Sequence, residues 1–203
     1  MPRRLFRISA DAPQWQKDMV ARLDRELRDA YPELFGAGLR RMLMVGRGRG
    51  DLYRGYGTYV RRRAAMIPRG TVLGVYVGNI EDDTGGPYHL QLPGVTGPRR
   101  ERWFPVVNGQ LEVYQRKVYQ AATYNHTCSR PTVASRTFGG GRLKCKLAIA
   151  ARRLWPGDEL TWNYGEQYVH RHGNLAELRR EFPGAHACMC RNGRCPYNSV
   201  LIY

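Results

Sequence analysis

The chain has 203 residues, of which 42% are hydrophobic and 25% charged, and its formal net charge is +16. This length and apolar content are enough for one hydrophobic core with a small appendage. No apolar run approaches the roughly 18 residues that span a bilayer, and no secretory signal is recognisable, so we expect an intracellular protein without membrane segments. The basic excess predicts an acidic partner such as nucleic acid, although arginines on a solvated face give the same composition.

Residues 1–45 are expected to form a helical accessory segment. Asp11 is placed to cap a helix that has Pro13 in its first turn, and Pro32 should end that helix. Apolar residues recur every four positions along one face, at Trp15, Met19, Leu23 and Leu27. This face either packs on the main core or binds a partner.

Short strands rich in β-branched and aromatic residues are predicted next, at 42–45, 57–60 and 71–77. A loop-rich insert at about 81–111 should hold one strand, at 88–92. Further along, the pattern predicts a short helix at 112–123, a strand at 145–151 that packs Cys145, and a helix at 174–182. This pattern is β-rich with a few short helices.

Three stretches carry residues typical of functional sites. They are Tyr124-Asn125-His126-Thr127-Cys128, Gly157-Asp158-Glu159-Leu160-Thr161-Trp162-Asn163-Tyr164-Gly165 and Cys188-Met189-Cys190-Arg191-Asn192-Gly193-Arg194-Cys195. The chain has five cysteines, an odd number that would leave one thiol over if all the others formed disulfides. The spacing of the three cysteines in the tail suits a tetrahedral metal ion, which needs a fourth ligand from elsewhere.

Together with Gly55-Tyr56-Gly57 and Tyr76-Val77-Gly78 upstream, these stretches occur in an order that resembles the SET-domain protein lysine methyltransferases. The resemblance covers about residues 50–198. It implies a β-rich α+β fold in which small curved sheets surround a threaded-loop pseudoknot. It also implies a SET domain at 46–165 and a zinc-binding post-SET tail at 166–203.

The resemblance also assigns the site residues. Those that would bind S-adenosylmethionine are Arg54, Tyr56, Gly57, Tyr124, Asn125 and His126. Those that would line the lysine channel and act in catalysis are Tyr164, Tyr76 and Trp162. Those that would hold one structural zinc ion are Cys128, Cys188, Cys190 and Cys195. An aromatic channel beside a sulfonium group suits this chemistry because it favours the neutral, nucleophilic form of lysine.

The chain departs from the family pattern at several positions. Ala122-Thr123-Tyr124 stands where the family commonly has Arg-Phe ahead of its Asn-His pair, and Asn163 replaces a frequent Asp. Trp162 stands where Phe or Tyr usually sets how many methyl groups fit. A larger ring predicts mono- or dimethyl-lysine as the product, unless the indole swings outward and widens the channel or Trp162 only fills the core.

The expected function is therefore methyl transfer to a lysine in a basic protein tail by a monomeric enzyme. The resemblance favours a histone or nucleosome in a nucleus, including a host nucleus reached by a bacterial effector. A ribosomal or nucleoid protein in the bacterial cytoplasm is the alternative substrate. Two other classes stay open: a catalytically silent nucleic-acid-binding module, and a structural protein held together by zinc. The net charge of +16 is compatible with contact between the protein and nucleic acid or another acidic surface.

Overall fold

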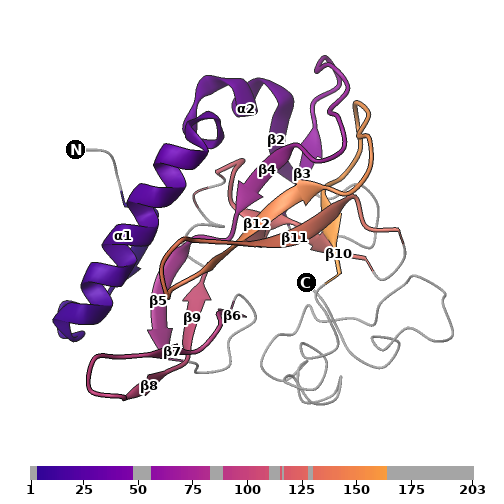
Figure 1. The fold of residues 1–203 in the computed structure, drawn as a ribbon. Helices are drawn as coiled ribbons and strands as arrows, with labels where there is room; N and C mark the ends of the chain where they lie inside the picture. The colour runs from indigo at the N-terminus through magenta and orange to yellow at the C-terminus, as the bar shows by residue number, and fades with distance from the viewer. Residues whose placement is uncertain are drawn as a thin grey trace, which may run out of the picture. The chain divides into compact units, whose positions relative to one another are not determined.

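The computed structural model describes residues 4–47, 56–82, 89–109, 115, 117–127 and 130–163 (Figure 1). Two compact units alternate along the chain: the first contains 1–41, 72–122 and 135–149, and the second 42–71, 123–134 and 150–203. The described part is β-rich with a few short helices and one longer one, and its strands form small separate sheets. A β-rich α+β class is therefore confirmed at this level, whereas the domain bounds expected from sequence stay a prediction.

The first unit contains a four-stranded sheet and the longest described helix. The strands lie in the order β1 (Phe6–Ile8), β5 (Gly78–Asp82), β9 (Pro105–Asn108) and β6 (His89–Gln91), with β1 parallel to β5 and the other pairs antiparallel. Helix α1 (Gln14–Ala30) buries Val20, Leu23 and Leu27. The backbone amides of Leu5 and Phe6 both donate hydrogen bonds to Oδ1 of Asp24, which fastens the edge strand β1 to α1.

The helix predicted from the apolar period is confirmed, but its predicted cap is wrong. Pro13 occupies the capping position, with φ −53° and no side-chain hydrogen bond. Asp11 lies two residues upstream of the capping position, and its own amide donates to Oγ of Ser9 at 3.2 Å. The helix ends at Ala30, ahead of Pro32, as expected. Pro32 then opens the 3-10 helix η1 (Pro32–Phe35), which is followed by α2 (Ala37–Met42).

The region from 72 to 123 contains more strands than its sequence predicts. Strand β4 (Val72–Val75) ends two residues early, and the chain enters β5 at Gly78, whose φ is +155°. A side chain on Gly78 would collide with the Asn108 backbone, so glycine is required there. The insert adds to the expected strand β6 a hairpin of β7 (Val95–Thr96) and β8 (Arg102–Trp103), followed by β9. Instead of the helix predicted at 112–123, the described residues there form a β-bridge from Gln120 to Val75 and the 3-10 helix η2 (Ala121–Thr123).

A three-stranded sheet has the order β11 (Val133–Phe138), β12 (Cys145–Ala150) and β4. The strand predicted at 145–151 is confirmed in β12. Cys145 is buried, and burial raises the pKa of its thiol to about 12. It is therefore a packed cysteine, as predicted, and its raised pKa disfavours the reactive thiolate. The helix predicted at 174–182 lies outside the described residues.

The second unit contains two short strand pairs. Strand β2 (Leu43–Arg47) pairs antiparallel with β3 (Tyr56–Val60), and β10 (Asn125–His126) pairs parallel with β13 (Thr161–Trp162). Backbone hydrogen bonds join β3 to the segment ahead of β13: Val60 N–H to the Asp158 carbonyl at 2.8 Å, and Leu160 N–H to the Thr58 carbonyl at 2.7 Å. Three segments far apart in the sequence therefore meet at β3, β10 and β13. None of the described helices is long and apolar enough to cross a membrane.

Candidate functional site

Gly57 lies in β3 beside three polar side chains of the second unit. A Cβ atom built on Gly57 would lie 2.7 Å from Oε1 of Glu159, 2.8 Å from Nδ2 of Asn125 and 2.9 Å from the Tyr59 hydroxyl oxygen. Cβ atoms do not approach other heavy atoms this closely, so the residue must be glycine unless these side chains move. The Gly57 backbone is therefore directly accessible to an amide, a carboxylate and a phenol.

Asn125 and Glu159 form the centre of this cluster. Asn125 is 4% exposed in β10, and its Nδ2 donates a hydrogen bond of 2.6 Å to Oε1 of Glu159. Burial raises the pKa of Glu159, while the hydrogen bonds that its carboxylate receives from Asn125 and Tyr59 act in the opposite direction. The bond to Glu159 uses one of the two amide protons of Asn125. The other proton and the amide oxygen can serve a ligand.

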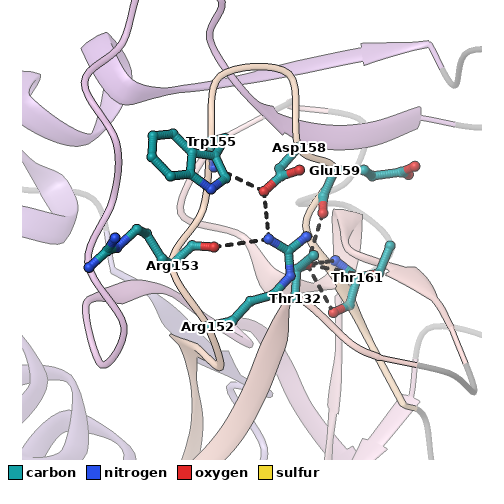
Figure 2. A network of polar contacts seen from close by, with 7 residues as sticks. All are labelled: Thr132, Arg152, Arg153, Trp155, Asp158, Glu159 and Thr161. Carbon is teal, nitrogen blue, oxygen red and sulfur yellow. Dashed lines mark hydrogen bonds and ion pairs between the residues drawn. The ribbon is translucent and has the colours of Figure 1, made fainter.

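Thr132 holds the backbone on both sides of Leu160, as Figure 2 shows. Its buried hydroxyl donates to the Glu159 carbonyl at 2.8 Å and accepts a hydrogen bond of 2.7 Å from the Thr161 amide. The carbonyl and hydroxyl oxygens of Thr161 both lie 3.3 Å from the same hydroxyl. One side chain thus fixes the chain where Glu159 leads into β13.

The turn ahead of Glu159 is closed by Asp158. Oδ2 of Asp158 accepts hydrogen bonds of 2.9 Å from the Trp155 amide and from Nη1 of Arg152 (Figure 2). The same Arg152 nitrogen donates to the Arg153 carbonyl at 2.9 Å. Gly157 has φ +94°, a conformation that favours glycine in such a turn. Glu159 therefore follows a turn whose geometry is fixed by these hydrogen bonds.

A buried hydroxyl pair joins β3 to the segment ahead of Asn125. Oγ1 of Thr58 and Oγ1 of Thr123 lie 2.6 Å apart, and both side chains are buried. Thr123 is one of the positions at which the sequence departs from the SET pattern. Here the departure has a structural role, because a hydroxyl at 123 has a hydrogen-bonding partner on β3.

Tyr124 and Trp162 pack edge to face, with ring centroids 6.2 Å apart and an interplanar angle of 66°. Tyr124 is fully buried, and burial raises the pKa of its phenol, so the hydroxyl stays protonated. Trp162 is 7% exposed, which agrees with a packing role.

The other predicted site residues are distributed as follows. Tyr56 lies in β3 opposite Arg47, and His126 lies in β10 opposite Trp162. Tyr76 belongs to the first unit, where it is buried and its amide donates to the Lys146 carbonyl at 3.0 Å.

Six predicted site residues lie outside the described ranges: Arg54, Tyr164, Cys128, Cys188, Cys190 and Cys195. Among the described residues, no group of three or more His, Cys, Asp or Glu side chains is placed to hold a metal ion. All four of the predicted zinc ligands are among the six undescribed residues, so the zinc site stays a prediction.

Three residues of the cluster are absent from the sequence-based assignment. Glu159 belongs to the stretch from Gly157 to Gly165, which was predicted to be part of a functional site, but no role was predicted for this residue. Tyr59 lies two residues after Gly57, and the period of a strand places both on one face. No local pattern pointed to Thr132, because its partners are about 30 residues away in the sequence.

A cleft of about 590 Å³ opens in the first unit, beside β1, the start of α1 and β5. Its lining includes Arg7, Gln16, Asn79, Glu81 and Trp103. None of the residues predicted for the site lines this cleft. Its mixed lining of one arginine, amides and carboxylates does not select one class of ligand.

The cluster around Gly57 fits a ligand that carries both charges and hydroxyl groups. An amide offers a donor and an acceptor without adding net charge, a carboxylate accepts from hydroxyl or ammonium groups, and Gly57 has no side chain between its backbone and these two groups. The amino-acid end and the ribose of S-adenosylmethionine have such groups, so the residues present fit this cofactor. In searches against known proteins, no family model matches the chain, and no curated protein matches it.

Proposed function

We propose that this protein is an S-adenosylmethionine-dependent protein-lysine N-methyltransferase with a SET-like fold. The observation that carries the proposal is the convergence of the Gly57 backbone, the Asn125 amide and the Glu159 carboxylate from three distant segments. Gly57 and Asn125 are residues to which the sequence resemblance assigns cofactor binding. Asn125 donates a hydrogen bond of 2.6 Å to Oε1 of Glu159, and a Cβ atom built on Gly57 would lie 2.7 Å from the same oxygen, which supports one shared binding site.

In the proposed site, Asn125 and the Gly57 backbone bind the amino-acid end of the cofactor, and Glu159 accepts hydrogen bonds from hydroxyl or ammonium groups. S-adenosylmethionine supplies an electrophilic methyl group on a sulfonium. The lysine nitrogen forms the new bond to carbon as the sulfur–carbon bond breaks, and water takes the lysine proton.

Lysine has a reference pKa of about 10.4, so its channel must favour the neutral amine. Tyr164 and Tyr76 are proposed to orient that amine. Alignment alone contributes up to about 7–11 kcal/mol in favourable systems, so no metal or carboxylate base is needed for the transfer itself.

The proposed substrate is a lysine in the basic tail of a histone, with a ribosomal or nucleoid protein as the alternative. A chain of net charge +16 does not attract a basic tail directly. It attracts the nucleic acid that carries such proteins, which brings enzyme and substrate together.

The first experiment measures cofactor binding by calorimetry. Wild-type protein should bind S-adenosylmethionine, and Asn125→Ala should weaken binding at least about tenfold, equivalent to about 1.4 kcal/mol. Gln91→Ala removes an exposed amide in the first unit and should bind as the wild type does. If wild-type protein binds no cofactor, the proposal is wrong and a silent module is favoured.

The second experiment follows transfer of a radiolabelled methyl group onto nucleosomes, free histones and a bacterial lysate. Tyr164→Phe should keep cofactor affinity and lose at least about tenfold in turnover, because it removes only a hydroxyl. Unchanged turnover would remove Tyr164 from the mechanism. The protein class that is labelled decides between the two proposed substrates.

A further inference from the structure

Two loops of the second unit run side by side and together carry most of its described arginines. The loops are 61–66 and 152–158. Gly157 N–H donates to the Val60 carbonyl at 2.9 Å, and Ile67 and Leu154 exchange two backbone hydrogen bonds of 2.9 Å. Because these bonds join the loops at both ends, residues 61–66 lie across from Trp155 and Pro156.

These loops and the neighbouring Arg69 form a surface that we name the arginine surface. Its members are all exposed: Arg61, Arg62, Arg63, Arg69, Arg152, Arg153 and Trp155. Among the described residues of the second unit, the carboxylates are Asp158 and Glu159. Asp158 already pairs with Arg152 at 2.9 Å, and Glu159 is hydrogen-bonded to Asn125. The arginine surface is therefore strongly positive, with little neutralisation from the described part of its own unit.

Trp155 adds a flat apolar ring to this charge. Its side chain is 54% exposed, while its backbone amide is held by Asp158. Figure 2 shows the indole directed away from the Asp158 contacts, with the Arg153 side chain also extending away from that carboxylate. An exposed indole in a turn of fixed geometry costs little conformational entropy when another ring stacks on it.

We propose that the arginine surface binds nucleic acid, with guanidinium groups on the phosphates and Trp155 stacked on an unpaired base. Guanidinium groups match phosphate oxygens in geometry as well as in charge. Positive residues that track a backbone, together with an aromatic ring for the bases, are the two components of single-strand recognition. An acidic protein would neutralise the charges of the arginines but would provide no base to stack on Trp155. This inference does not depend on the proposed methyltransferase activity.

The arginine contribution is tested by fluorescence anisotropy of a labelled single-stranded oligonucleotide over a range of salt concentrations. The triple variant Arg62→Gln, Arg63→Gln, Arg153→Gln should bind at least about tenfold more weakly. It should also lower the slope of log affinity against log salt by about 2, since each phosphate contact on a single strand contributes about 0.7.

The matched control carries the same loss of charge on exposed arginines of the first unit: Arg25→Gln, Arg99→Gln and Arg102→Gln. It should keep wild-type affinity within about twofold. Equal weakening by both triples would overturn the proposal, because net charge alone would then explain binding.

The stacking contribution is tested with Trp155→Ala against Phe104→Ala, which removes a ring that is also 54% exposed but lies in the first unit. Trp155→Ala should weaken binding of the single strand about fivefold or more and leave duplex binding nearly unchanged. Phe104→Ala should change neither.

Three further results would contradict the inference. They are no effect of Trp155→Ala on single-strand binding, an equal effect of Trp155→Ala on duplex and single-strand binding, or competition by polyglutamate as strong as by an oligonucleotide of equal charge. Thermal unfolding of every variant confirms that the fold is kept. No cofactor is present in the binding assay, so its result is separate from the test of methyl transfer.

Discussion

The side-chain amide of Asn125 donates a hydrogen bond of 2.6 Å to the carboxylate of Glu159, which lies 34 residues further along the chain. The parallel pairing of β10 with β13 brings the two segments together. Thr132 donates a hydrogen bond to the Glu159 carbonyl and accepts one from the Thr161 amide, which holds Glu159 just ahead of β13. The bond therefore depends on both the strand register and a side-chain clamp outside the pair.

Gly57→Ala should weaken S-adenosylmethionine binding at least about tenfold and lower stability by about 1–3 kcal/mol. The added methyl group would lie 2.7–2.9 Å from three polar side-chain atoms, so Asn125, Glu159 or Tyr59 must move. Gly38→Ala is the control, since a Cβ there meets nothing within 4 Å and the residue is in α2. Calorimetry and urea unfolding measure both effects. Wild-type affinity in Gly57→Ala would show that this cluster is not the cofactor site.

Glu159→Gln should change how stability depends on pH. Burial raises the pKa of Glu159 above its ordinary value of 4.5, so the native state binds more protons than the unfolded state between the two values. The contribution of Glu159 to stability is therefore present at low pH and lost as pH rises through the folded-state pKa. The stability of Glu159→Gln relative to wild type should therefore increase as the pH rises from the ordinary pKa of 4.5 through the raised folded-state pKa.

Urea unfolding at several pH values measures this difference, with the exposed Glu33→Gln as the control. A difference for Glu159→Gln that is constant with pH would mean that the carboxylate is not desolvated in the folded protein.

Thr132→Val should lower the free energy of unfolding by about 1–3 kcal/mol, because it leaves the Glu159 carbonyl and the Thr161 amide without their hydroxyl partner. The shape of the side chain is kept, so packing changes little. Thr137→Val is the matched control on β11, where the residue is exposed and its hydroxyl accepts a hydrogen bond from Nζ of Lys146. Its effect should stay within about 0.5 kcal/mol. Equal effects of the two variants would refute the role given to Thr132.

Trp162→Phe should raise the methylation state of the product if the indole limits the lysine channel. Mass spectrometry after exhaustive turnover detects this as trimethyl-lysine, which the wild type should not form in quantity. Trp103→Phe is the control, since Trp103 is 6% exposed in the first unit. If Trp162 only packs against Tyr124, its replacement should lower stability without changing the product.

Metal analysis should find close to one zinc per chain, held by Cys128 and the three tail cysteines. Cys128→Ser should lose the metal and weaken cofactor binding, whereas Cys145→Ser should retain both, because Cys145 is buried in β12. Chelation should lower the temperature of unfolding of the wild type. A disulfide at Cys188 or Cys190 under non-reducing conditions would contradict the zinc site.

The sequence by itself determined the elements whose signal is local. The spacing of Leu23 and Leu27 predicts α1, and the strand around Cys145 follows from alternation within a few residues. The stretch that contains Asn125 was also recognisable as a candidate site, since the residue types and their order are visible in one dimension. The residue at which α1 begins could not be predicted, because Asp11 and Pro13 are both typical of helix starts and only the backbone geometry selects between them.

The tertiary structure alone decided which residues meet. No local pattern pairs Asn125 with Glu159 or Thr58 with Thr123, because each contact closes a long loop and is stabilised by the packing of other segments. Exposure is decided in the same way: Trp155 and Trp162 are the same residue type seven positions apart, yet one is 54% exposed and the other 7%. The physical reason is that burial depends on what the rest of the chain places over a side chain.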